Sequence, residues 1–208
     1  MNRKYIPKVL LLFFGSVLLT GILTGFKWIS DQQDEKITIV MFGDSITKGG
    51  DWATLLGRSD VKNSGFPGFT TSHLVWLLKE NVIDLKPSVC FLEGGINDIG
   101  VGIPLDRTKN NYRSLIEGLQ EHKIIPVVQS IIYQQDNPES KIQVDSLNSY
   151  LRTYCQSQGV YYLDLNAKLS SSKGLNAQYT TDGTHINQVA YEIWATEVKK
   201  LLNSILKH

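Results

Sequence analysis

Short apolar segments alternate with amphipathic ones along most of the chain. Apolar stretches rich in β-branched residues, typical of buried strands, cover residues 37–42, 61–63, 88–92, 124–131 and 160–165. Helical periodicity covers residues 52–56, 71–81, 108–122, 145–157 and 187–206. Short, continuously apolar strands that alternate with helices are typical of a parallel sheet covered on both faces. The pattern therefore predicts an α/β fold with about five parallel strands.

The same pattern gives expectations for single residues outside any motif. Trp76 and Trp194 fall in helical segments, and we expect both in the core. Cys90 and Cys155 lie within apolar or helical stretches and resemble small buried hydrophobic residues more than a disulfide. Their pairing depends on whether the fold brings them together. Residues 136–140, DNPES, are expected to form a polar loop.

The first 30 residues differ from the rest of the chain. Residues 1–8 are basic and residues 9–26 contain no charged side chain. At about 1.5 Å per residue, a helix continued to Ile29 approaches the roughly 30 Å of a bilayer core. The segment is either a cleaved secretory signal or an uncleaved membrane anchor. We favour the anchor, because the best cleavage sites place Leu19 or Leu23 where a small residue is required.

This N-terminal segment also predicts the organisation and location of the protein. Residues 31–36, DQQDEK, are expected to form a short charged tether, and residues 37–208 one folded domain. The basic residues Arg3, Lys4 and Lys8 place the remainder outside the cytoplasm. If the segment is cleaved instead, the domain is secreted or periplasmic. In either case the membrane is an expected partner or neighbour.

Charge and composition exclude several classes of function. The 208 residues are 42% hydrophobic and 20% charged, which suits one well-buried core. Residues 31–208 hold all 20 acidic residues and 17 of the 21 basic ones, which gives them a formal net charge of −3. No basic patch suggests nucleic acid as a partner. With 2 Cys and 4 His in the chain, a structural zinc site is not expected. No cofactor is expected either.

Polar segments, most of them containing glycine, follow the predicted strands. In open α/β sheets, ligands bind beyond the carboxyl ends of the strands. The segments found there are GDS at residues 43–45, NSGFPG at 63–68, GGIND at 94–98 and QS at 129–130, and DGTH follows the fifth strand at 182–185. Because carboxyl ends of parallel strands share one edge of the sheet, these segments are expected to meet.

Together these segments contain the groups that acyl transfer requires. A serine hydroxyl needs a base, and His185 is the plausible base for Ser45. Asp182, three residues earlier, can fix the tautomer of the imidazole. The oxyanion needs donors that already point at it, and the backbone N–H groups of Ser45 and Gly68 and the side-chain amide of Asn97 can supply them.

Each of these residues also has an ordinary structural explanation. Ser45 alone would be a helix cap, Asp182 with its following glycine a turn, and His185 a surface histidine. Asp44 can hold the corner by accepting backbone hydrogen bonds. Glu93 either orients the loop that carries the oxyanion donor or is buried against a backbone N–H. The structural explanation must nevertheless account for four coincidences at one edge of the sheet.

In this order, the four motifs resemble those of the SGNH hydrolases, also called GDSL esterases and lipases. The matching residues are Gly43-Asp44-Ser45, Asn63-x-Gly65-x-x-Gly68, Gly95-x-Asn97-Asp98 and Asp182-x-x-His185. The resemblance implies Ser45 as nucleophile, Asp182 and His185 as its partners, and Ser45, Gly68 and Asn97 as oxyanion donors. It also implies a three-layer α/β/α, flavodoxin-like domain with strand order 2-1-3-4-5 and no metal.

The sequence departs from the family pattern at two positions. Ile46 stands where leucine is common after the serine, and Phe69 stands where a polar residue such as aspartate is common. The second difference concerns the shape of the pocket, for which Trp52, Phe66 and Phe69 are candidate lining residues. Asp44, Asn63, Gly65, Gly95 and Asp98 are candidate supporting residues.

These observations predict a membrane-tethered, extracytoplasmic serine esterase. The expected substrates are short-chain esters, acetyl esters first, on carbohydrate or other components of the cell envelope. One alternative is an O-acyltransferase that uses the same triad with a sugar hydroxyl in place of water. The other is a non-catalytic module that binds glycans in the same cleft.

Overall fold

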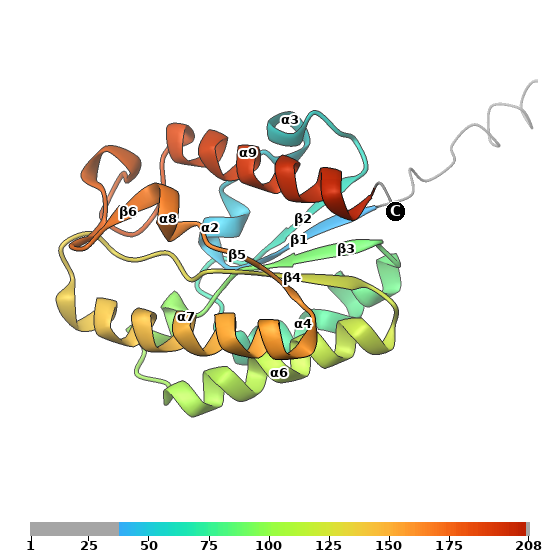
Figure 1. Cartoon of the computed structure of the whole chain (residues 1–208), viewed down its shortest axis with the longest axis horizontal. Helices are drawn as coiled ribbons and strands as arrows, with labels where there is room; N and C mark the ends of the chain where they lie inside the picture. The colour runs from blue at the N-terminus through green and yellow to red at the C-terminus, as the bar shows by residue number, and fades with distance from the viewer. Residues whose placement is uncertain (1–37, 207–208) are drawn as a thin grey trace, which may run out of the picture. The chain divides into compact units, whose positions relative to one another are not determined.

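Five parallel strands form the centre of the structure, a computed structural model that describes residues 38–206 (Figure 1). The strands are β1 (Ile39–Gly43), β2 (Val61–Gly65), β3 (Val89–Leu92), β4 (Ile125–Gln129) and β5 (Tyr161–Leu163). Their order in the sheet is β2-β1-β3-β4-β5. The predicted α/β class and the order implied by the family resemblance are therefore confirmed.

The centre of the sheet is apolar on both faces. In the parallel register, Ile39 of β1 pairs with Val61 of β2 on one side and Val89 of β3 on the other. All residues of β1 and β3 are buried. A strand buried on both faces needs no alternation of polar and apolar residues, which explains why these segments are continuously apolar in the sequence.

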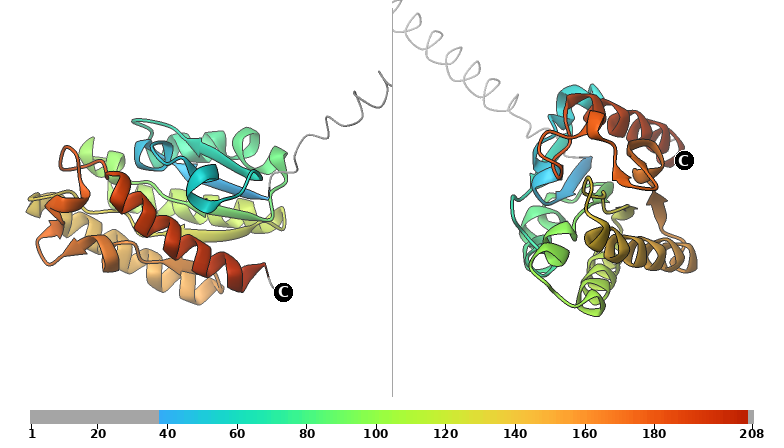
Figure 2. Two further views of the ribbon diagram at one scale, coloured as in Figure 1. Left: turned by 90° about the horizontal axis from the view of Figure 1, so that it is seen from above. Right: turned by 90° about the vertical axis from the view of Figure 1, so that its left-hand side faces the viewer.

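Helices cover both faces of the sheet and make three layers. They are α3 (Trp52–Leu56), α4 (Thr71–Asn81), α6 (Leu105–Glu121), α7 (Pro138–Gln158) and α9 (Gln188–Ile205). Figure 1 shows α3 and α9 on one face and α4, α6 and α7 on the other, and the turned views of Figure 2 show the same layers.

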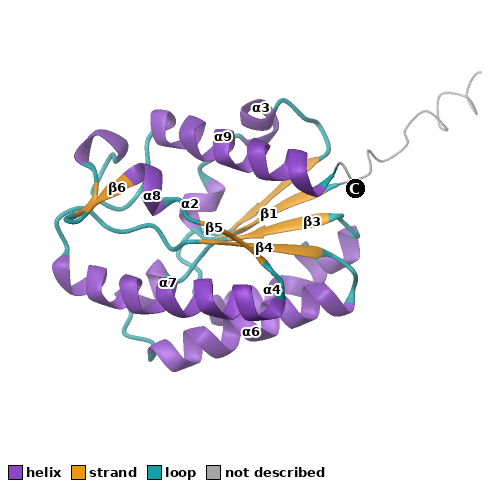
Figure 3. Cartoon of the chain, in the orientation of Figure 1, coloured by secondary structure: helices purple, strands orange, loops and turns teal. Residues whose placement is uncertain are grey.

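Several short elements connect the long ones. They are α2 (Ser45–Lys48), the 3-10 turn η1 (Ile83–Leu85), α5 (Ile96–Gly100), α8 (Asn166–Leu169), the antiparallel pair β6 (Ser170–Ser171) and β7 (Gly174–Leu175), and the 3-10 turn η2 (Ala177–Tyr179) (Figure 3). None was predicted, because each is too short to show a hydrophobic period. The segment between β5 and Asp182 is thus largely structured.

One helix begins earlier than predicted. The predicted helix over 145–157 is α7, which starts at Pro138, so the expectation of a loop over 136–140 is wrong for its second half. The side-chain oxygen of Asn137 accepts a hydrogen bond of 3.0 Å from the N–H of Ser140 and caps the helix. Pro138 then occupies the first turn, where its missing N–H costs nothing.

The two helical tryptophans have different environments. Trp194 is 0% exposed, as expected, but Trp76 is 79% exposed, so the expectation of a buried Trp76 is wrong. The buried face of α4 is formed by Thr71, Leu74 and Leu78, and Trp76 falls on the other side of the helix. Cys90 and Cys155 are buried free thiols, as their surroundings in the sequence indicated.

The predicted anchor and tether, residues 1–36, lie outside the described residues. Within residues 38–206, no helix is long and apolar enough to cross a membrane. The anchor therefore stays a prediction from the sequence.

Candidate active site

Ser45 lies at the corner between the central strand β1 and the short helix α2. Asp44 caps this helix, because its Oδ1 accepts a hydrogen bond of 2.9 Å from the N–H of Ile46. Ser45 is the first residue of the helix, and its side chain is half-buried. The cap of this helix is therefore Asp44, and Ser45 is its first residue.

The structure brings Ser45, His185 and Asp182 into one hydrogen-bonded chain. Oγ of Ser45 lies 3.0 Å from Nε2 of His185, although the two residues are 140 positions apart. Nδ1 of the same ring lies 2.7 Å from Oδ2 of Asp182. The carboxylate places the ring proton on Nδ1, which leaves the lone pair of Nε2 for the serine hydroxyl. This is the arrangement that a serine nucleophile requires.

Asp182 also holds the turn on which His185 lies. Its Oδ1 accepts backbone hydrogen bonds of 2.9 Å from Thr184 and 2.7 Å from His185. The bonds from the His185 side chain and from these two N–H groups favour the carboxylate and hold the pKa of Asp182 well below its ordinary value. Asp182 is therefore ionised wherever His185 can act as a base.

Residues that the sequence did not single out fix this turn from the side. The hydroxyl of Thr180 donates a 2.8 Å hydrogen bond to the carbonyl of His185. The side-chain amide of Gln134 donates a 2.9 Å bond to Oγ1 of Thr184, and the N–H of Gln135 donates a 2.8 Å bond to the carbonyl of Gly183. Two hydrogen bonds thus hold the turn against the loop that follows β4. No sequence motif indicates this contact.

Asn97 lies in the first turn of α5, at the end of β3. Its side-chain amide donates a 3.0 Å hydrogen bond to the backbone carbonyl of Phe69. An amide nitrogen has two hydrogens, so the second remains available to a ligand. The bond to Phe69 also determines which side-chain atom is nitrogen, because a carbonyl accepts only from the NH₂ group.

Gly68 lies in the exposed loop between β2 and α4. Its φ of +77° lies in the left-handed region, which glycine adopts without strain. In residues 38–206, no hydrogen bond to a protein acceptor uses the backbone N–H of Ser45 or of Gly68. Both predicted oxyanion N–H donors therefore remain unused by the described part of the protein.

Asn63 and Gly65 hold the end of β2 against the Ser45 corner. The Asn63 amide donates to the carbonyls of Lys48 at 3.0 Å and Gly50 at 2.9 Å. A Cβ at Gly65 would lie 2.3 Å from the backbone nitrogen of Lys48. The second motif therefore supports the loop that carries the serine, and Gly65 is needed for the close approach.

Asp98 and Gly95 support the Asn97 turn. Asp98 is 0% exposed and accepts hydrogen bonds from the N–H of Thr71 at 2.8 Å and from the hydroxyl of Thr108 at 3.1 Å. It thereby joins α5 to the starts of α4 and α6. Gly95 precedes α5 with a φ of +122°, which a residue with a side chain adopts only with strain.

The aromatic candidates take different positions. Trp52 is 1% exposed, and its indole N–H donates a 2.8 Å hydrogen bond to the carbonyl of Thr47. Trp52 therefore supports the Ser45 corner from within the core and does not line an open pocket. Phe69 is half-buried and stacks on Phe66 with ring centroids 5.5 Å apart. This pair is the aromatic surface beside Gly68.

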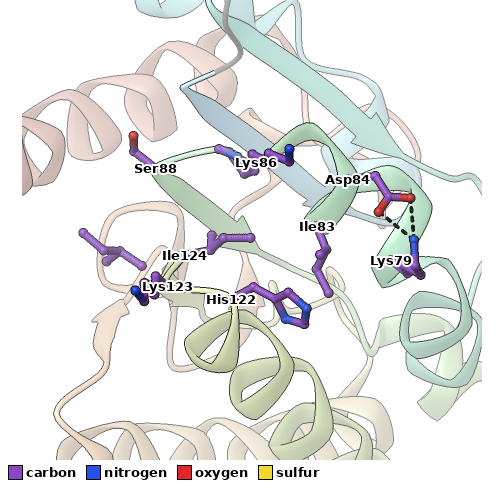
Figure 4. Close-up of a pocket in the computed structure, with 10 residues that line it drawn as sticks. Lys79, Ile83, Asp84, Lys86, Ser88, His122, Lys123 and Ile124 are labelled. Carbon is purple, nitrogen blue, oxygen red and sulfur yellow. Dashed lines mark hydrogen bonds and ion pairs between the residues drawn. The ribbon is translucent and has the colours of Figure 1, made fainter.

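A cavity of about 710 Å³ lies at the other edge of the sheet (Figure 4). Its lining includes Lys86 and Ser88, which precede β3, and Lys123, which precedes β4. These residues lie at the amino ends of the strands, whereas Ser45 follows the carboxyl end of β1. The cavity is therefore separate from the candidate active site. Within residues 38–206, no group of three or more His, Cys, Asp or Glu side chains is placed to hold a metal.

The sequence was compared with known families and proteins. The family model described as GDSL-like lipase/acylhydrolase matches residues 41–193. An N-acylneuraminate cytidylyltransferase from Streptococcus agalactiae is 27% identical over 129 residues, which cover 58% of this chain and 31% of that protein. The chain thus spans about a third of the length of this curated relative.

Similar solved structures support the fold. A GDSL-like lipase from Bacteroides thetaiotaomicron has a TM-score of 0.76 at 23% identity and covers 82% of this chain and 90% of that one. An acetyl-xylooligosaccharide esterase variant from Geobacillus has a TM-score of 0.69 at 20% identity and covers 82% of this chain and 96% of that one.

Proposed function

The chain belongs to the GDSL-like lipase/acylhydrolase family, and from this premise we propose that it hydrolyses esters with Ser45 as the nucleophile. The observation that carries the proposal is the chain of hydrogen bonds from Ser45 Oγ to His185 Nε2 at 3.0 Å and from His185 Nδ1 to Asp182 at 2.7 Å. No other serine in residues 38–206 contacts a histidine that is held by a carboxylate.

The first half of the reaction forms an acyl-enzyme. The hydroxyl proton of Ser45 passes to Nε2 of His185 while Oγ bonds to the ester carbonyl carbon. The resulting oxyanion accepts hydrogen bonds from the N–H groups of Ser45 and Gly68 and from the free amide hydrogen of Asn97. The imidazolium then gives its proton to the leaving alcohol as the carbon–oxygen bond breaks.

The second half releases the acid. A water molecule gives a proton to Nε2 of His185 and attacks the acyl carbon, and the same donors stabilise the second oxyanion. When the intermediate collapses, the proton returns to Oγ of Ser45. Asp182 stays a carboxylate throughout and stabilises the imidazolium, and the reaction needs no metal or cofactor.

The proposed substrates are short acyl esters, acetyl esters first, on carbohydrate or cell-envelope polymers. The side chains of His185 and Asp182 are 45% and 53% exposed, so the reactive groups lie open to a bulky alcohol. A long acyl chain would need an apolar cavity to gain its burial energy. The relatives also concern sugars: one is an acetyl-xylooligosaccharide esterase and another an N-acylneuraminate cytidylyltransferase.

One assay tests the proposed nucleophile. The full chain, purified in mild detergent, should hydrolyse p-nitrophenyl acetate, and Ser45→Ala should lower kcat by at least about a thousandfold. Ser204→Ala, which changes an exposed serine on α9, serves as the matched control and should leave the rate unchanged. Activity retained in Ser45→Ala would refute the assignment.

Acetate release from a panel of acetylated sugars and envelope polymers tests the substrate class. Free acetate formed without an added acceptor supports a hydrolase and argues against an O-acyltransferase, which needs a sugar hydroxyl. Binding of the panel without acetate release would support a glycan-binding module instead.

The proposed location has its own test. Alkaline extraction of cell membranes should leave the full chain in the membrane fraction if residues 1–30 are an anchor. Recovery in the soluble fraction would contradict the anchor.

A further inference from the structure

Two carboxyl groups are buried side by side beneath the Ser45 corner. Asp44 follows β1, Glu93 follows the neighbouring strand β3, and their exposures are 0% and 1%. One oxygen of each is used: Asp44 Oδ1 accepts from the N–H of Ile46 at 2.9 Å, and Glu93 Oε2 accepts from the hydroxyl of Thr47 at 3.0 Å. The proposed mechanism does not use Glu93.

The remaining oxygens of this pair lack other partners. Among the described residues, Asp44 Oδ2 and Glu93 Oε1 are buried and accept no hydrogen bond from any N–H or O–H donor. Because Phe42 of β1 pairs with Leu92 of β3, Asp44 and Glu93 leave adjacent strands next to each other. A Cβ added at Gly94, the residue after Glu93, would lie 4.0 Å from Oδ2 of Asp44. Two adjacent buried carboxylates would repel each other, and each would leave an oxygen unsolvated. A single proton between the two oxygens removes both problems.

We propose that Glu93 is protonated and donates a hydrogen bond to the carboxylate of Asp44, and that this pair positions Ser45 relative to Asn97. Asp44 is the anion because the N–H of Ile46 already stabilises its negative charge. Glu93 is the acid because burial, followed by the charge of Asp44, raises its pKa well above the usual range. Burial also raises the pKa of Asp44, to about 6.

In the described part of the chain, no nearby charged side chain compensates a second negative charge on the pair of Asp44 and Glu93, so the shared proton does. The charges of His185 and Asp98 act on Asp44 with opposite signs. The hydroxyls of Tyr112 and Tyr191 donate hydrogen bonds to the carbonyls of Gly94 and Ile46, beside the pair. Within residues 38–206, no lysine or arginine forms an ion pair with either carboxyl. A positive charge on His185 lowers the pKa of Asp44 and so favours its carboxylate form.

The pair joins the two halves of the proposed site. Thr47, bonded to Glu93, belongs to the same short helix α2 as Ser45. On the other side, Glu93 leads through two glycines into α5, which carries Asn97. The nucleophile and the oxyanion donor are thus connected through one carboxylic acid. This inference rests on the proposed roles of Ser45 and Asn97.

Kinetics of two variants test the positioning. In Glu93→Gln the amide can donate to Asp44 and its oxygen can accept from Thr47, so kcat and KM should stay within about threefold of the wild type. In Glu93→Ala the Asp44 carboxylate is buried without its partner and the corner shifts, so kcat should fall by about ten- to a hundredfold with little change in KM. Equal losses in both variants would overturn the proposal, and so would full activity in Glu93→Ala.

Infrared spectroscopy tests the proton without relying on catalysis. Near neutral pH, the full chain should show the C=O stretch of a carboxylic acid, with a shift in D₂O. The band should disappear in Glu93→Gln and persist in Glu121→Gln, which changes an exposed glutamate. A wild-type spectrum without the band would overturn the shared proton even if Ser45 is the nucleophile. If the band is present but Ser45→Ala keeps its activity, only the proposed function is refuted.

Discussion

The side-chain amide of Asn97 donates a hydrogen bond of 3.0 Å to the backbone carbonyl of Phe69, the residue that follows Gly68. The two segments meet although they follow different strands, β3 and β2, because β1 alone lies between these strands in the sheet. The bond orients the amide before any substrate arrives. Donors that are already oriented lower the barrier without a reorganisation cost in the transition state.

Asn97→Ala is therefore expected to reduce kcat by about a hundred- to a thousandfold, the usual effect of losing one oxyanion donor. KM should change little, because the missing bond strengthens only as the oxyanion forms. Steady-state kinetics with p-nitrophenyl acetate measure both values. Asn203→Ala, an exposed asparagine on α9, is the control. A variant whose KM rises while kcat is kept would place Asn97 in ground-state binding.

Gly65→Ala is expected to destabilise the fold. The new Cβ would lie 2.3 Å from the backbone nitrogen and 2.5 Å from Cα of Lys48, and backbone atoms can yield only by moving the Ser45 corner. Overpacking of this kind costs roughly 1–3 kcal/mol of unfolding free energy. Urea denaturation measures the loss. Gly100→Ala is the matched control, because a Cβ there meets nothing within 4 Å. If Gly65→Ala were as stable as Gly100→Ala, the backbones of Gly65 and Lys48 could not lie as close together as the structure places them.

Activity should fall in acid, because protonated His185 can no longer accept the proton of Ser45. Asp182 does not cause this fall, since the hydrogen bonds from His185 and Thr184 keep its pKa well below the ordinary value. Asp182→Asn should lower kcat by about a thousandfold or more, because the imidazolium loses its anionic partner. The pH dependence of kcat/KM for both proteins checks this. A flat wild-type profile from acid to alkaline pH would contradict the role of His185.

The sequence predicted the sheet and the edge at which the site lies. Continuous apolar runs such as residues 37–42 and 88–92 indicated buried parallel strands, and the structure places β1 and β3 there. The rule that ligands bind at the carboxyl ends of such strands then brought Ser45, Asn97 and His185 to one edge. The prediction of the sheet succeeded because it depends on local residue types and on the parallel direction of the strands.

Contacts between distant segments could not be predicted. The bond from Gln134 to Thr184 joins two loops 50 residues apart, and neither loop has a hydrophobic period. Trp76 was misplaced for a related reason: a tryptophan in a helix favours burial on average, but the phase of α4 is set by Leu74 and Leu78. The sequence singled out Glu93 but not its neighbour Asp44 as a partner. The two residues follow strands that are far apart in the sequence, and they come together because β1 and β3 are adjacent in the sheet.

Gln134→Ala is expected to lower kcat by about tenfold, because its side chain holds Thr184 next to the proposed base, and small displacements of a catalytic group are costly. Gln135→Ala is a close control. Gln135 supports the same turn through its backbone N–H, which alanine keeps, while its side-chain amide donates a hydrogen bond to the exposed Asp136. Equal effects of the two substitutions would show that the side chain of Gln134 does not position the turn.

Glu93→Gln should change how stability depends on pH. In the unfolded chain Glu93 ionises in the ordinary range of a glutamate, but in the folded protein burial and the charge of Asp44 raise its pKa well above that range. Between the two values the unfolded state has released a proton that the folded state keeps. The free energy of unfolding of the wild type therefore falls as pH rises, by at most about 1.4 kcal/mol per pH unit for one group. Glutamine does not ionise, so the variant lacks this loss.

The free energy of unfolding of Glu93→Gln, relative to the wild type, should accordingly increase from about pH 5 to about pH 8. Urea denaturation at a series of pH values measures the difference, provided that the slopes of the transitions agree. Glu121→Gln, an exposed glutamate at the end of α6, should show a difference that does not vary with pH. A constant difference for Glu93→Gln as well would mean that Glu93 ionises equally in both states, and that Asp44 meets a second carboxylate instead of a carboxylic acid.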